Sequence, residues 1–162
     1  MKRTVLVGLV LAVSLGGCDD RSDDSSDDPV IEVEADDKEM NAAIAHARST
    51  VGEFVKRLAN PGPADDGFSV KKMIEDGQEV EHFWLTGVSY SEGEFTGKIG
   101  NDPQSVGNVK FGQKVSVAET EITDWMYLDD GKMIGNFTLR VLFGRMPKEE
   151  AEALRKQFKM DE

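Results

Sequence analysis

The sequence predicts a two-layer α+β domain, with a mostly antiparallel sheet of five or six strands, a long N-terminal helix and a short C-terminal helix. Three observations carry this prediction. Apolar residues recur every three or four positions over about 22 residues after Asp37, as on one face of an amphipathic helix. Short runs separated by turn signals then fill residues 68–143, and a second helical pattern follows Pro147. No strand–helix–strand alternation is present, which argues against a parallel nucleotide-binding sheet.

Residues 1–17 have the pattern of a lipoprotein signal peptide. Two basic residues precede an apolar run over residues 5–13, which is too short to span a bilayer core of about 30 Å as a helix. The following LGGC, residues 15–18, resembles a bacterial lipobox. The resemblance implies cleavage before Cys18 and a lipid on its sulfur, and two or more acyl chains give stable anchoring. The alternative is an ordinary secretory signal with an incidental cysteine.

Residues 18–36 are predicted to be a lipidated cysteine followed by a disordered acidic tether. Residues 19–29 contain six Asp, three Ser and one Arg and no apolar side chain, so nothing offsets the entropy of ordering this stretch. Calcium binding is the alternative, but the run lacks the Gly and terminal Glu of an EF-hand loop. Asp19 and Asp20 resemble an inner-membrane retention signal, which favours a periplasm-facing anchor in the inner membrane. Residues 30–34 are either a short edge strand or the end of the tether.

Charge and cysteine usage limit the partners. The chain carries a formal net charge of −12 and has a single cysteine. An acidic chain is not expected to bind nucleic acid, because phosphate contacts require clustered Lys and Arg. A single cysteine allows neither an internal disulfide nor a cysteine-based zinc cluster. The membrane is therefore the one partner that the sequence identifies, through the lipid on Cys18.

Residues 37–162 are predicted to form the folded domain. Asp36 or Asp37 is expected to cap the long helix, and the Pro-Gly-Pro at residues 61–63 to end it. The apolar stripe is expected to pack on the domain's own sheet, the alternative being a dimer seam. His46 lies off the stripe and is expected on the surface.

The strands follow from alternation and turns. Runs at residues 68–75, 79–90 and 94–100 are separated by turn signals at residues 76–77 and 91–93. The run at residues 114–122 is expected to continue the alternation to Ile122. Residues 122–142 are expected to form a central hairpin that turns at residues 129–131, with residues 132–143 as a strand buried on both faces. In the closing helix, Ala151, Leu154 and Phe158 are expected to face inward.

The runs EHFWLTGVSYSEGEFTGKIGNDP, DWMY and GKMIGNFTLRVL resemble the YegJ-like family of bacterial proteins, the domain of unknown function 2314. The resemblance covers roughly residues 38–145. It is carried by twelve positions in order, which are Trp84, Gly93, Phe95, Gly97, Asn101, Pro103, Ile122, Asp124, Trp125, Gly135, Thr138 and Arg140. The family has no established activity, so the resemblance implies a fold unit without a reaction. A looser similarity to domains proposed as immunity proteins suggests an acidic face that masks a basic toxin.

Residues that could carry chemistry are few. The sequence contains two histidines, His46 and His82, and no nucleophile elbow, P-loop or His-Glu-x-x-His motif. Neither a metal nor a cofactor is expected. Asp124 is expected either to pair with Arg140 across the hairpin or to cap the backbone before Trp125.

The sequence therefore predicts a non-catalytic, lipid-anchored periplasmic domain that binds a protein or a small ligand. The residues expected in a binding or structural motif are Trp84, Asn101, Asp124, Trp125, Asn136, Thr138 and Arg140. Two alternatives stay open. One is an envelope hydrolase that uses Asp124, His82 and Arg140, and the other is a purely structural envelope lipoprotein.

Overall fold

The computed structural model describes residues 4–8, 30–34 and 37–160. Cys18, Asp19 and Asp20 lie outside these ranges. The elements, in chain order, are β1 (Thr4–Gly8), β2 (Val30–Glu34), α1 (Lys38–Ala59), β3 (Asp65–Asp76), β4 (Glu79–Ser91), β5 (Glu94–Ile99), β6 (Lys114–Ala118), β7 (Ile122–Asp129), β8 (Lys132–Gly135), α2 (Phe137–Phe143) and α3 (Lys148–Gln157). Within the described ranges, none of the helices has the length and apolarity needed to cross a bilayer.

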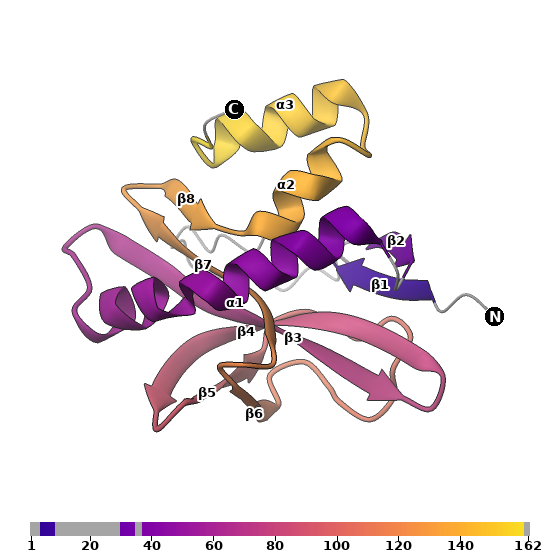
Figure 1. The fold of residues 1–162 in the computed structure, drawn as a ribbon, viewed down its shortest axis with the longest axis horizontal. Helices are drawn as coiled ribbons and strands as arrows, with labels where there is room; N and C mark the ends of the chain where they lie inside the picture. The colour runs from indigo at the N-terminus through magenta and orange to yellow at the C-terminus, as the bar shows by residue number, and fades with distance from the viewer. Residues whose placement is uncertain (1–3, 9–29, 35–36, 161–162) are drawn as a thin grey trace, which may run out of the picture.

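The predicted α+β class is confirmed. After residue 37, six strands pair antiparallel: β4 pairs with β3, β3 with β7 and β7 with β8, while β5 joins β4 to β6. The long helix α1 crosses this sheet, and α2 and α3 lie at the β8 end, away from β5 and β6 (Figure 1). Residues 30–34 do form an edge strand, which pairs with β1, and β1 in turn pairs parallel with β4. The strand β1 lies within the predicted signal peptide, residues 1–17, where the sequence predicts no strand.

Helix α1 begins and ends where the sequence predicts. The Asp37 carboxylate accepts a hydrogen bond of 2.9 Å from the Met40 backbone N–H, as an N-cap residue does. Ala47, Val51 and Phe54 face the sheet and pack in the main core with residues of β3, β4, β5, β6 and β7. The apolar stripe therefore packs on the domain's own sheet, and His46 is exposed, as expected.

The run at residues 114–122 is two strands rather than one continuous strand. Strand β6 ends at Ala118, and the backbone N–H of Glu121 donates back to the Ala118 carbonyl across a tight turn. Strand β6 pairs with β5, whereas β7 begins at Ile122 and pairs with β3. The polar residues 119–121 have no apolar side chain that would hold them in the sheet, so they turn the chain instead.

The predicted strand over residues 132–143 is wrong beyond Gly135. Gly135 and Asn136 have φ values of 81° and 51°, and two consecutive left-handed residues cannot continue a strand. Helix α2 follows, because the Asp124 carboxylate accepts the backbone N–H groups of Phe137 and Thr138 in its first turn. The lack of alternation in this segment thus reflects a helix, not a strand buried on both faces.

The C-terminal helix forms a second, smaller core. Ala151, Leu154 and Phe158 are buried, as predicted for its inner stripe. They pack with Met133 of β8 and with residues of α2. The end of the chain is thereby fixed against the face of the β7–β8 hairpin that points away from α1.

Candidate functional site

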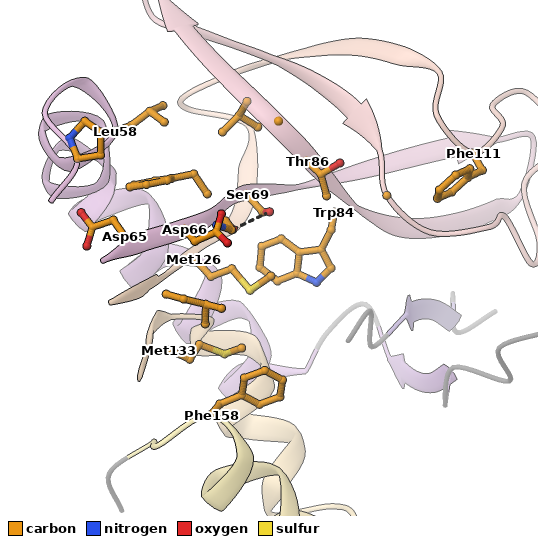
Figure 2. A pocket seen from close by; sticks show the side chains of 17 residues that line it. Leu58, Asp65, Asp66, Ser69, Trp84, Thr86, Phe111, Met126, Met133 and Phe158 are labelled. Carbon is orange, nitrogen blue, oxygen red and sulfur yellow. Dashed lines mark hydrogen bonds between the residues drawn. The ribbon is translucent and has the colours of Figure 1, made fainter. Parts of the chain in front are cut away.

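A pocket of about 700 Å³ extends from the end of α1 to the second, smaller core at Met133 and Phe158 (Figure 2). Its walls come from β3, β4, β7 and β8, from the end of α1 and from the end of α3. Apolar and aromatic side chains predominate, and they include Phe68, Trp84, Val88, Phe111, Met126, Leu128, Met133 and Phe158. A concave site of this size and composition is typical of small-molecule binding.

The mouth of the pocket carries an exposed aromatic residue. Phe111 is 61% exposed and belongs to the irregular segment between β5 and β6. Phe111 therefore lines the pocket while most of its side chain remains in contact with water. The other large exposed apolar residue, Met73, is 43% exposed and does not line the pocket.

Polar side chains line the pocket at the start of β3 and at Thr86 of β4. Asp65 pairs with the Arg57 guanidinium, which holds the pKa of that carboxyl below its usual range. Asp66 accepts the Gly67 N–H at 2.7 Å, and the Ser69 hydroxyl donates to the Gly67 carbonyl at 3.0 Å. These groups mainly stabilise their own loop, so the pocket has an apolar floor and one acidic end.

A buried lysine lies behind the pocket wall. The Nζ atom of Lys71 is 4.4 Å from the centre of the Trp84 ring and donates a 2.6 Å hydrogen bond to the Thr138 hydroxyl. Burial lowers the pKa of Lys71 to about 8, although Asp124 opposes this shift. Lys71 therefore connects the tryptophan of the pocket to the start of α2.

Asp124 is fully buried and acts as a structural cap. One carboxylate oxygen accepts the N–H groups of Trp125 and Phe137 at 2.9 and 3.1 Å, and the other accepts the N–H and hydroxyl of Thr138 at 2.8 and 2.6 Å. The expected cap before Trp125 is thus present. The alternative ion pair with Arg140 is wrong, because residue 140 lies in a helix rather than on the opposing strand, and its side chain is exposed.

His82 is also buried and has a fixed partner. Its Nδ1 atom is 2.9 Å from the Thr123 hydroxyl. Burial, and then the charge of Lys71, lowers the pKa of His82 to about 3, so the ring is neutral near pH 7. Within the described residues, His82, Asp124 and Arg140 make no hydrogen bond to one another.

The other predicted residues hold segments together. The Asn101 side chain accepts the Trp84 backbone N–H at 3.2 Å, which fixes the segment after β5 against β4. The Trp125 indole N–H donates to the Ala47 carbonyl at 3.0 Å, which fixes α1 against β7. Asn136 is buried between two methionines, to which its amide nitrogen donates.

Sequence reasoning missed Lys71, Glu81, Met126 and Met133. The buried Glu81 carboxylate accepts the backbone N–H groups of residues 104–106 and so holds the segment that leads to Phe111. In the sequence, Lys71 and Glu81 are charged residues within predicted strands, and charged residues are mostly exposed. Alternation along the strand does place Lys71 on the other face of the sheet from the core residue Val70. Only the position of α2, however, shows that this other face is covered.

Residues 37–161 match the family model described as "Uncharacterized protein conserved in bacteria (DUF2314)". The chain belongs to this family. It is 44% identical over 120 residues to "Uncharacterized protein YegJ" of Escherichia coli K12, an alignment that covers 74% of this chain and 77% of that protein. It is 31% identical over 132 residues to a "Putative ankyrin repeat protein" of Neisseria meningitidis serogroup B, covering 76% of this chain and 52% of that protein. No solved structure matches.

Several DUF2314 positions on which the sequence resemblance rests meet at one point of the fold. Asp124, Gly135 and Thr138 together make the junction between β8 and α2. A Cβ atom at Gly135 would lie 2.2 Å from the Trp125 carbonyl oxygen, so only glycine fits there. In this DUF2314 chain, Asp124, Gly135 and Thr138 lie behind the pocket wall, whereas Trp84, another of these positions, lines the pocket.

Proposed function

We propose that the mature protein is a non-catalytic, lipid-anchored binding domain of the bacterial envelope, and that the pocket beside Trp84 holds an apolar small ligand. The observation that carries the proposal is the open pocket of about 700 Å³ with Phe111 exposed at its mouth. A pocket of this kind stabilises a bound ligand by removing apolar surface from water, at roughly 25 cal/mol per Å².

The proposal of a binding rather than a catalytic role is supported by how the polar residues are used. Each oxygen of Asp124 already accepts two hydrogen bonds. The ring of His82 is held by Thr123 and has its pKa lowered to about 3. A general base needs a free lone pair within reach of a substrate, and neither group offers one to the pocket.

Anchoring through Cys18 is the second part of the proposal. It is supported by the LGGC of residues 15–18 after a short apolar run, and by the acidic stretch that separates Cys18 from the domain. Growth with an alkyne-tagged palmitate should label the wild-type protein, and Cys18→Ser should abolish the label. Equal labelling of both proteins would contradict lipidation at Cys18.

The pocket is tested by titrating the protein with N-phenyl-1-naphthylamine, a neutral apolar fluorophore. Saturable fluorescence and energy transfer from Trp84 are expected. Phe111→Ser should weaken binding, and Thr86→Trp, which adds bulk at an exposed residue of the wall, should weaken it further. Met73→Ser is the matched control, because it removes an exposed apolar side chain outside the pocket. Equal binding by all four proteins would contradict the proposal.

A further inference from the structure

Two methionine sulfurs contact one buried amide at the pocket wall. The Nδ2 atom of Asn136 lies 3.6 Å from the Met126 sulfur and 3.3 Å from the Met133 sulfur. The two methionines come from the paired strands β7 and β8, and both line the pocket (Figure 2). Two thioethers are thus held close together, with an open path from the pocket.

The Asn136 side chain has an unused acceptor. The residue is 5% exposed, and its Oδ1 atom has no hydrogen-bond partner among the described residues. A buried carbonyl oxygen without a partner loses its hydrogen bonds to water and gains none in return, which is unfavourable. The Nδ2 group donates only to sulfur, which is a weak acceptor. The left-handed backbone at residue 136 favours asparagine, but it does not require a buried side-chain oxygen without a partner.

A cation between the three side chains would satisfy this arrangement. A half-turn of the Asn136 amide exchanges Oδ1 and Nδ2, and it would place Oδ1 at similar distances from both sulfurs. Two ligand atoms bound to one metal ion at distances of about 2.1 and 2.3 Å lie about 3.6 Å apart at a tetrahedral angle. The observed separations of 3.6 and 3.3 Å are close to that value.

We propose that Met126, Met133 and Asn136 form a binding site for a soft monovalent cation of the Cu(I) class. Thioether sulfur selects Cu(I) among the biological metals, whereas zinc, calcium and magnesium favour imidazole, thiolate or carboxylate ligands. Among the described residues, no group of three or more His, Cys, Asp or Glu could hold a harder metal ion. The ion would enter through the pocket, but its binding does not require that the pocket also holds an apolar ligand.

The test uses Ag(I), a redox-inert probe for Cu(I) sites, with the chain carrying Cys18→Ser to remove a competing thiol. With the methionine methyl groups labelled with carbon-13, the signals of Met126 and Met133 should shift on titration and saturate at one equivalent. Calorimetry should give the dissociation constant. The double variant Met126→Leu/Met133→Leu keeps the side-chain volume and should weaken binding at least about tenfold.

Two further variants make the test specific. Met73→Leu removes an exposed thioether and should leave the affinity unchanged. Asn136→Ala should weaken binding less than loss of both sulfurs, because one weak ligand is lost. Shifts confined to Met73, or no shift at Met126 and Met133 with Ag(I) in tenfold excess, would overturn the site. Ag(I) binding without binding of the naphthylamine fluorophore would support the metal site and contradict the apolar-ligand proposal.

Discussion

Replacing Asp124 with asparagine is the most direct test of how this domain is held together. The carboxylate is fully buried and accepts four hydrogen bonds, two on each oxygen. Asparagine has the same shape and can keep the two bonds from Trp125 and Phe137. Its NH₂ group would then face the Thr138 N–H, donor against donor. The buried charge of Lys71 would also lose the carboxylate that opposes its desolvation.

The expected cost follows from these losses. Hydrogen bonds to a charged group contribute about 1.5–3 kcal/mol each, and breaking a buried charge arrangement by removing one partner costs about 3–5 kcal/mol. We therefore expect Asp124→Asn to lower the free energy of unfolding by about 3–5 kcal/mol, a large part of the 5–15 kcal/mol typical of a domain. Urea denaturation followed by far-UV circular dichroism measures this directly.

Two controls separate the cap from a general charge effect. Arg140→Ala should change the free energy of unfolding by less than about 0.5 kcal/mol, because that side chain is exposed. Lys71→Met removes the buried charge, so adding it to Asp124→Asn should recover part of the loss. A cost below about 1 kcal/mol for Asp124→Asn, or an equal cost for Arg140→Ala, would refute this account of the β8–α2 junction.

Three further predictions concern other parts of the fold. Gly135→Ala should lower the free energy of unfolding by at least about 3 kcal/mol, because its Cβ would lie 2.2 Å from a β7 backbone oxygen. Gly77→Ala is the control, because Gly77 also has a positive φ but a Cβ there would meet open space, and it should cost about 1 kcal/mol. The free energy of unfolding should fall from pH 6.5 towards pH 3 by up to about 1.4 kcal/mol per pH unit, because in this range His82 binds a proton in the unfolded chain but not in the folded one. Urea titrations at several pH values measure this profile, and His82→Asn should flatten it. Asp37→Ala should lower the free energy of unfolding, measured by thermal denaturation, by about 1–2 kcal/mol. Asp37→Asn should lower it less, because asparagine keeps the helix cap and loses only the ion pair with Arg145.

The elements that the sequence predicts correctly are those specified by local signals. Helix α1 has its own cap at Asp37 and its own apolar stripe, and the Asp76-Gly77 turn defines the β3–β4 hairpin. Helix α2 could not be predicted in this way. Aromatic and β-branched residues such as Phe137, Thr138 and Val141 favour a strand locally. The helix depends on a carboxylate from β7, which is a tertiary contact that overrides local propensity.

The pocket was missed for a related reason. Its lining residues come from separate strands and from the ends of α1 and α3, and each apolar one resembles an ordinary core residue in the sequence. Of these residues, only Trp84 belongs to the binding or structural motif that the sequence predicts. Polar residues such as Asp124 and Thr138 are the usual candidates for a site in a sequence, but here both are buried behind the pocket wall. What distinguishes the pocket is that side chains from several separate elements surround one hollow, and no local pattern specifies that.

The buried polar cluster behind Trp84, formed by Lys71, Asp124 and Thr138, stabilises the domain less efficiently than apolar packing would. Desolvating the Lys71 ammonium costs enough to lower its pKa to about 8, and a well-packed apolar residue is often at least as stable at such a position. What Lys71 provides instead is geometry, because it holds the Trp84 ring on one side and the Thr138 hydroxyl on the other. The hydrogen bond from Thr138 to Asp124 then fixes the start of α2, next to Asn136. The cluster therefore sets the position of the pocket wall, and its cost in stability is what we expect of a scaffold built around the proposed binding site.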